Sequence, residues 1–213
     1  QKQNKTHTCR YLLKSYVLLG DNDWLVMWER AYAAIKRYIS VDDWFLPAVA
    51  ETGESVAPGV VDALSAWLPA AQVLVGDVSA ARRSHMNFYR LALRYGLLPE
   101  NFNVRSLNFH GAASRGYPLR PEFVESTYYL YRATHDPFYL QVAAEYMQAI
   151  DTYTRVPCGF AAVESVEALP PLDELDDNNL SRLPLLNSSR VLSPFFAQQR
   201  ATARDRSVVR GEC

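Results

Sequence analysis

The chain has 213 residues, 49% of them hydrophobic and 12% aromatic, so it is long enough to form one domain with a buried core. Lysine and arginine number 22 against 23 aspartates and glutamates, and this balance argues against a nucleic-acid-binding surface. No run of about 18 apolar residues occurs, so the sequence predicts no membrane span.

One layout occurs three times along the chain: a periodic apolar run, a Gly-Asp or His-Asp pair, then a second periodic run. The aspartates of these pairs are Asp21, Asp77 and Asp136, which lie 56 and 59 residues apart. A glycine can take the left-handed conformation that ends a helix, and each aspartate can cap the helix that follows. We therefore predict three helical hairpins, over residues 11–38, 62–95 and 123–153.

Apolar residues recur at helical spacing within the runs, as Leu12, Tyr16 and Leu19 do, and are expected to pack in the core. The connectors at 41–57 and 98–118 are long enough to carry function. Segment 43–50 could form a short strand, which Pro47 would keep at a sheet edge.

Beyond Val163 the composition changes to a stretch rich in Pro, Asp, Asn and Ser, followed by a basic end. This composition predicts that residues 167–213 form a disordered or poorly packed tail. The three cysteines form no CxxC motif. Metal-ligand spacing is also missing among the four histidines, His7, His85, His110 and His135.

The segment from Tyr117 to Ser126 is the leading site candidate. Pro121 suits the first position of a helix and holds Arg120 extended. Glu122 is then expected at the second helical position, and Glu125, three residues on, shares its face.

The helix dipole and the Arg120 guanidinium are both expected to favour an ionised Glu122. An ionised carboxylate suits a general base that activates water. The alternative interpretation is that the Pro-Glu pair simply makes a good helix N-terminus.

The stretch YPLRPEFVESTYYLYRATHDPFYL resembles glycoside hydrolase family 47, the class I α-1,2-mannosidases, through its RPE-x-x-ES and YLYRAT-x-DP motifs. YTRVPCGFAAV at 153–163, YLLKSYVLLGD at 11–21, LPAAQVLVGD at 68–77 and LLPENF at 97–102 are most similar to the ER degradation-enhancing branch. The resemblance covers about residues 11–163.

The resemblance implies an all-α fold, a partial (αα)7 toroid built of three hairpins. It also implies inverting trimming of α-1,2-linked mannose from high-mannose N-glycans, with a bound Ca²⁺, in the degradation of misfolded glycoproteins in the endoplasmic reticulum lumen. By the same resemblance Glu122 is catalytic, Arg120 and Glu125 contact the sugar, and an ER oxidoreductase is a partner. Cys158 would pair with a cysteine outside this chain.

Two departures from the family pattern bear on activity. Thr6 stands where the family has a catalytic aspartate, in an Asp-Ser-Tyr-Tyr-Glu-type stretch that here ends in Arg10. The calcium-holding threonine of the family has no counterpart, so the sequence offers no metal ligand. We therefore expect impaired catalysis.

These observations divide the chain into a non-matching segment 1–10, a partial barrel domain 11–166 and the tail 167–213. One alternative function is a non-catalytic module that binds glycans or glycoproteins. Another is a helical-repeat scaffold that binds proteins, which accounts for the repeat and leaves the RPE-x-x-ES motif unexplained.

Overall fold

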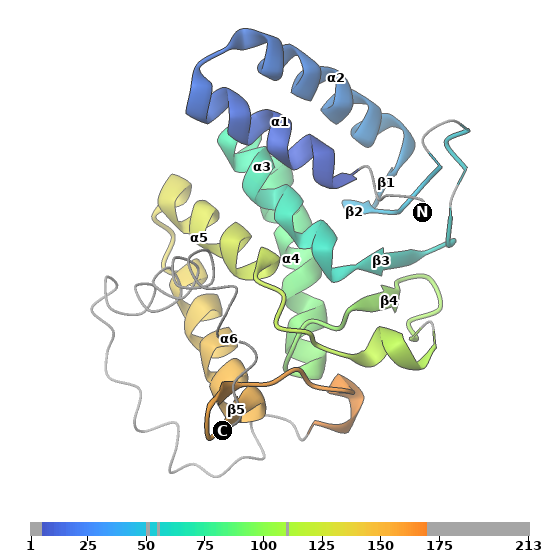
Figure 1. The fold of residues 1–213 in the computed structure, drawn as a ribbon, viewed down its shortest axis with the longest axis vertical. Coiled ribbons are helices and arrows are strands. Elements are labelled where there is room, and N and C mark those ends of the chain that lie inside the picture. The colour runs from blue at the N-terminus through green and yellow to red at the C-terminus, as the bar shows by residue number, and fades with distance from the viewer. Residues whose placement is uncertain (1–5, 50–51, 55, 110, 170–213) are drawn as a thin grey trace.

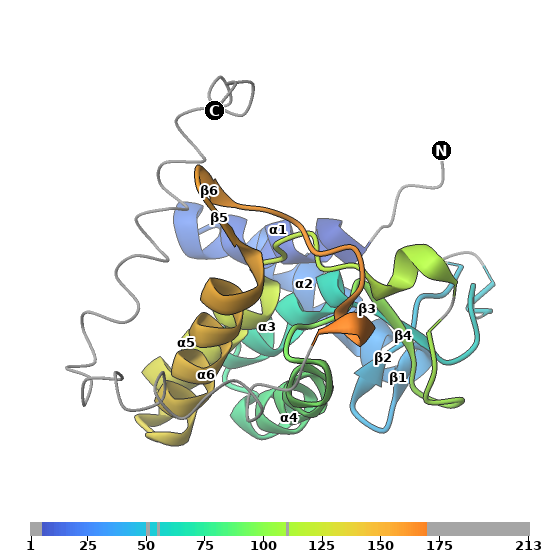
Figure 2. The same ribbon diagram turned by 90° about the horizontal axis from the view of Figure 1, so that it is seen from below.

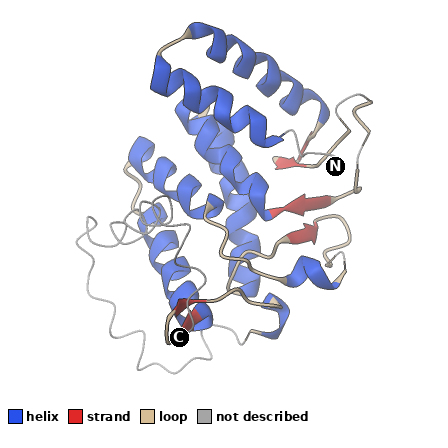
Figure 3. Ribbon diagram, in the orientation of Figure 1, coloured by secondary structure: helices blue, strands red, loops and turns tan. Residues whose placement is uncertain are grey.

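The computed structural model describes residues 6–49, 52–54, 56–109 and 111–169, and α-helices dominate this part of the chain (Figures 1 and 3). The helices pair in chain order into the three predicted hairpins, which are thereby confirmed. These are α1 (Thr6–Leu19) with α2 (Asn22–Tyr38), α3 (Leu68–Leu74) with α4 (Val78–Tyr95), and α5 (Glu122–Thr134) with α6 (Phe138–Thr154). His110 and most of the predicted tail, from residue 170 on, lie outside the described residues.

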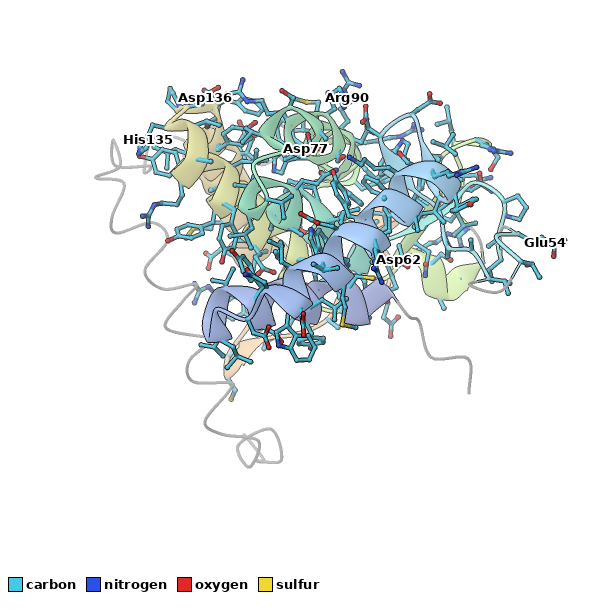
Figure 4. All side chains as sticks on the ribbon, turned by 90° about the horizontal axis from the view of Figure 1, so that it is seen from above. Glu54, Asp62, Asp77, Arg90, His135 and Asp136 are labelled. Carbon is cyan, nitrogen blue, oxygen red and sulfur yellow. The ribbon has the colours of Figure 1, made fainter. Side chains whose placement is uncertain are left out.

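The turn of each hairpin is built as its sequence predicts. Gly20, Gly76 and His135 have φ angles of 71°, 83° and 53°, in the left-handed region that ends a helix. His135 and the aspartate after it lie together at the turn between α5 and α6 (Figure 4). In all three turns that aspartate accepts a backbone N–H from the start of the next helix; the three are Asp21, Asp77 and Asp136.

Three two-stranded antiparallel sheets lie outside the helices, and of their strands the sequence suggested one, within 43–50 (Figure 3). The sheets are β1 (Ser40–Val41) with β2 (Trp44–Phe45), β3 (Val60–Asp62) with β4 (Asn101–Asn103), and β5 (Arg155–Val156) with β6 (Gly159–Phe160). β3 and β4 pair Val61 with Phe102, which ties the first long connector to the second. The strand predicted within 43–50 is confirmed only over Trp44–Phe45.

Three short 3-10 helices complete the described structure: η1 (Ala63–Trp67), η2 (Ala112–Arg115) and η3 (Val166–Ala168). η1 runs directly into α3, and Asp62 caps it by accepting the Ser65 N–H. η3 includes the first residues of the predicted tail, and its Val166 is buried.

The helix α3 lies between the other two hairpins and packs against both α1 and α5 (Figures 1 and 2). One core, around Trp28 and Trp67, joins the first hairpin to α3. A larger core, around Phe88 and Phe123, joins the second hairpin, the third hairpin and the connectors. Leu12 is buried as expected, but Leu19 is 64% exposed, so its place in the predicted core is wrong.

Among the described helices, none is both long and apolar enough to cross a bilayer. The mostly helical fold class is confirmed by the helix order. Closure into a seven-hairpin ring stays a prediction.

Candidate active site

The first turn of α5 carries both predicted carboxylates. The helix begins at Glu122, and Pro121 is its N-cap, one residue later than the sequence predicted. Glu122 and Glu125 share one helix face as expected, because the same guanidinium, that of Arg10, reaches both.

Glu122 is buried, with 7% of the residue exposed. Burial raises its pKa above the ordinary value, while Arg10 and Arg120 lower it and Glu125 raises it further. The desolvation cost of the charged form outweighs the two arginines, which themselves act in the expected direction and favour the ionised carboxylate. Its Oε2 is buried and has no hydrogen-bond partner among the described residues.

Two buried tyrosines lie close enough to Glu122 for its charge to affect them. Burial raises the pKa of Tyr117 to about 12, and the Glu122 charge adds to that shift. The pKa of Tyr146, whose hydroxyl accepts the Leu98 N–H, is raised for the same two reasons and by Tyr117. The surroundings of Glu122 are therefore largely dry and aromatic.

Two cations from α1 hold Glu125. Arg10 Nη2 donates to Glu125 Oε2 at 2.5 Å, and Lys14 Nζ donates to Glu125 Oε1 at 2.8 Å. Arg10 Nη1 also lies 3.7 Å from Glu122 Oε1. Sequence reasoning missed both cations, because it assigned Arg10 to the non-matching segment 1–10. The helix α1 extends back to Thr6 and places Arg10 and Lys14 one turn apart on one face.

Arg120 lies near Glu122 but binds elsewhere. Its Nε and Nη2 donate to the two carboxylate oxygens of Glu100, at 2.9 and 2.6 Å. This bidentate pair fixes the plane of the guanidinium and joins the beginning of the connector 98–118 to the start of α5. The role of Glu100 was not expected from the sequence.

His85 is a buried core histidine rather than a ligand. Its Nε2 bonds Thr127 Oγ1 at 2.7 Å, and its ring stacks on Phe123 at 5.0 Å between centroids. Thr127 Oγ1 also donates to the Phe123 carbonyl, so His85 Nε2 is the donor. Burial lowers the pKa of His85 to about 3, which agrees with a neutral ring.

A small pocket opens between α1 and α3, next to the carboxylates. Its polar side is made by Arg10, Lys14 and Glu125, and its apolar side includes Trp67 and Leu74. The enclosed space is about that of one water molecule.

The described residues do not fit a calcium ion. No group of three or more His, Cys, Asp or Glu in this part of the chain is placed to hold a metal. Glu125 is already neutralised by Arg10 and Lys14, and these two cations would repel a divalent ion at the same carboxylate. We therefore derive no step that passes through calcium.

Comparison with known proteins gives a consistent assignment. The model of glycosyl hydrolase family 47 matches residues 8–181, a longer span than the 11–163 of the motif resemblance. Alpha-mannosidase I MNS4 of Arabidopsis thaliana is 37% identical over 166 residues, 78% of this chain and 26% of that protein. Human ER degradation-enhancing alpha-mannosidase-like protein 3 is 41% identical over 173 residues, 81% of this chain and 18% of that protein.

The fold agrees with that assignment. An α-1,2-mannosidase from Trichoderma reesei superimposes with a TM-score of 0.61 at 18% identity, over 74% of this chain and 39% of that one. The chain thus spans well under half the length of these relatives. The matched span, the paired helices and the acidic turn of α5 show that this chain belongs to glycosyl hydrolase family 47.

Proposed function

We propose that this chain is part of a protein that processes high-mannose N-glycans on misfolded glycoproteins, in the manner of an inverting α-1,2-mannosidase. Family membership and the name of relatives that enhance ER degradation support this proposal. Glu122 is its catalytic carboxylate, while Arg120 and Glu125 contact or orient the sugar. The seven-hairpin ring would complete the walls of the site.

The observation that carries the proposal is the state of Glu122. A buried carboxylate with a raised pKa and an unpaired oxygen lowers the stability of a fold, and such groups concentrate at functional sites. A carboxylate with a raised pKa is also a stronger base once it is ionised, which suits the activation of water.

Inverting hydrolysis needs a second carboxyl group about 6.5–9.5 Å from the first, with a water between them and the sugar. Thr6, in the first turn of α1, cannot supply a carboxyl group. Glu125 is engaged by Arg10 and Lys14, so it is not free to act as an acid. We therefore infer that this chain alone turns over substrate slowly.

The test is release of mannose from a high-mannose glycan in the presence of calcium, with Glu122→Gln as the matched variant. Slow release that the variant abolishes supports the proposal. Release that is unchanged in the variant would remove Glu122 from the reaction. Robust turnover would contradict the inference of impaired catalysis.

A second candidate function is a non-catalytic module that binds glycans. The ion pairs of Arg10 and Lys14 with Glu125 favour it, because they engage the second carboxylate of this turn and leave no free acid there. Binding of a high-mannose glycan with no detectable release, weakened by Glu125→Gln, would select this candidate. No binding at millimolar ligand would exclude it.

The endoplasmic reticulum lumen is the compartment we propose, because the relatives that match are named for ER degradation. An ER oxidoreductase as partner stays a prediction from the family resemblance. A requirement for Ca²⁺ is likewise a proposal for the longer relatives, since the described residues hold no calcium site.

A further inference from the structure

The hydroxyl of Ser126 occupies an unusual place in the fold. Ser126 is fully buried, and its Oγ donates to the Ala66 carbonyl at 2.5 Å and accepts the Ala70 N–H at 3.0 Å. Ala66 and Ala70 are four residues apart, the pair that an uninterrupted α-helix would join directly. A side chain of α5 has therefore taken the place of one backbone hydrogen bond where η1 passes into α3.

The backbone at this junction needs an outside partner. η1 is a tighter 3-10 turn, in which the Leu68 N–H bonds the Ser65 carbonyl, and Pro69 at the start of α3 has no N–H to donate. Without the Ser126 hydroxyl, the Ala66 carbonyl and the Ala70 N–H would lose the partner that the structure gives them. A buried donor or acceptor left unpaired destabilises the fold.

We infer that Ser126 is a positioning residue, whose hydroxyl fixes the position of α5 along α3. This lock, the pair of hydrogen bonds from Ser126 to Ala66 and Ala70, thereby sets the burial of Glu122 and the contact of Glu125 with α1. Glu122 lies one turn before Ser126 on the same rigid helix, and Glu125 is its direct neighbour. A shift of α5 along α3 would move both carboxylates together. The consequence for glycans rests on the proposed function, whereas the lock itself does not.

The neighbouring hydroxyl provides a matched control. Thr127 is also buried, but it donates to the Phe123 carbonyl of its own helix and bonds His85 of α4. No hydrogen bond of Thr127 reaches the junction of η1 and α3. Thr127→Val therefore removes a buried hydroxyl of α5 without touching the lock.

The test compares Ser126→Ala with Thr127→Val in the full 213-residue chain. The measurement is an NMR titration of the Glu122 carboxyl carbon. We expect Ser126→Ala to lower the Glu122 pKa toward its ordinary value of 4.5, because a displaced α5 exposes the carboxylate. Thr127→Val should leave that pKa where it is in the parent chain. An unchanged pKa in Ser126→Ala, or an equal shift in both variants, overturns the inference.

If Ser126→Ala does not fold, Ser126→Thr tests the same inference, since it keeps the hydroxyl while disturbing the packing. Its Glu122 pKa is expected to match that of the parent chain, and a fall toward 4.5 overturns the inference. Glycan affinity is a separate readout, expected to fall about tenfold in Ser126→Ala, the equivalent of one hydrogen bond. A parent chain that binds no glycan contradicts the proposed function and leaves the titration result standing.

Discussion

Glu122 is subject to opposing electrostatic effects. Burial among aromatic side chains disfavours its charge, while the guanidinium of Arg10 at 3.7 Å and the more distant Arg120 favour it. Arg10 is about one-fifth exposed and hydrogen-bonded to Glu125, and Arg120 is neutralised by Glu100, so neither cation is fully available to Glu122. This explains why desolvation determines the direction of the pKa shift.

The raised pKa makes a prediction about stability. A carboxyl group whose pKa is raised by folding stabilises the folded state fully below its unfolded pKa, and this contribution is lost as the pH rises through the folded pKa. Glu122→Gln removes the titration, so the variant should gain stability relative to the parent chain between pH 4 and pH 7. Urea unfolding at both pH values measures the difference.

Glu125→Gln is the control for that experiment. It breaks the hydrogen bonds from Arg10 and Lys14 and leaves two cations without their carboxylate, so it should lower the free energy of unfolding at pH 7 by about 2 kcal/mol. A Glu122→Gln variant that loses stability between pH 4 and pH 7, as Glu125→Gln is expected to do, would show that Glu122 is stabilised by its charge.

At the scale of the elements, the three hairpin turns are built alike from different residues. Gly20 and Gly76 take left-handed φ angles at no steric cost, whereas His135 takes φ 53° with a side chain attached. Within the described part of the chain His135 is exposed, and its ring makes an edge contact with Tyr131 at 6.1 Å between centroids, so little packing compensates for the conformation.

The third turn should therefore tolerate a glycine better than its own histidine. We expect His135→Gly to raise the free energy of unfolding by about 0.5–1 kcal/mol. Gly76→Ala, at φ 83° with open space around it, should lower it by about 1 kcal/mol through backbone strain alone. Urea denaturation of both variants decides the matter, and a destabilised His135→Gly would mean that the imidazole makes contacts worth more than the strain.

The turns of the helical hairpins follow from the sequence, whereas the contacts of the candidate site do not. The Gly-Asp and His-Asp pairs act within two or three residues, so their capping role follows from the sequence alone. The contacts of Glu125 with Arg10 and Lys14 span 115 and 111 residues, and no local rule encodes them. The sequence places Arg120 two residues from Glu122, whereas in the fold its guanidinium forms a bidentate hydrogen bond with Glu100.

The desolvation of Glu122 is likewise not encoded by local rules. A helix N-terminus is visible in the sequence and favours a negative charge. The aromatic surroundings that outweigh it come from two other elements, with Tyr117 in a connector and Tyr146 on α6. Local rules therefore point to the acidic first turn of α5 but omit the desolvation that raises the pKa of Glu122.

At the scale of the whole molecule, apolar surface is unevenly covered. The helix α3 has neighbours on both sides, whereas α1 packs against α2 and α3 and leaves several large apolar side chains in solvent. Their exposed fractions range from 63% to 82%, for Tyr11, Val17, Leu18 and Leu19. Exposed apolar clusters of this kind are sites of association.

The chain should accordingly self-associate through α1. Burying apolar surface contributes about 25 cal/mol per Å², so covering several hundred Å² would stabilise a dimer by an amount on the order of 10 kcal/mol before the cost of association. Leu18→Lys should shift sedimentation velocity profiles toward monomer, because a charge at the most exposed position opposes burial of the apolar side chains of α1. Leu93→Lys, at an exposed leucine of α4, should leave the profile of the parent chain unchanged. A parent chain that sediments as a single monomer and melts sharply and reversibly would show that the exposed apolar side chains of α1 need no partner.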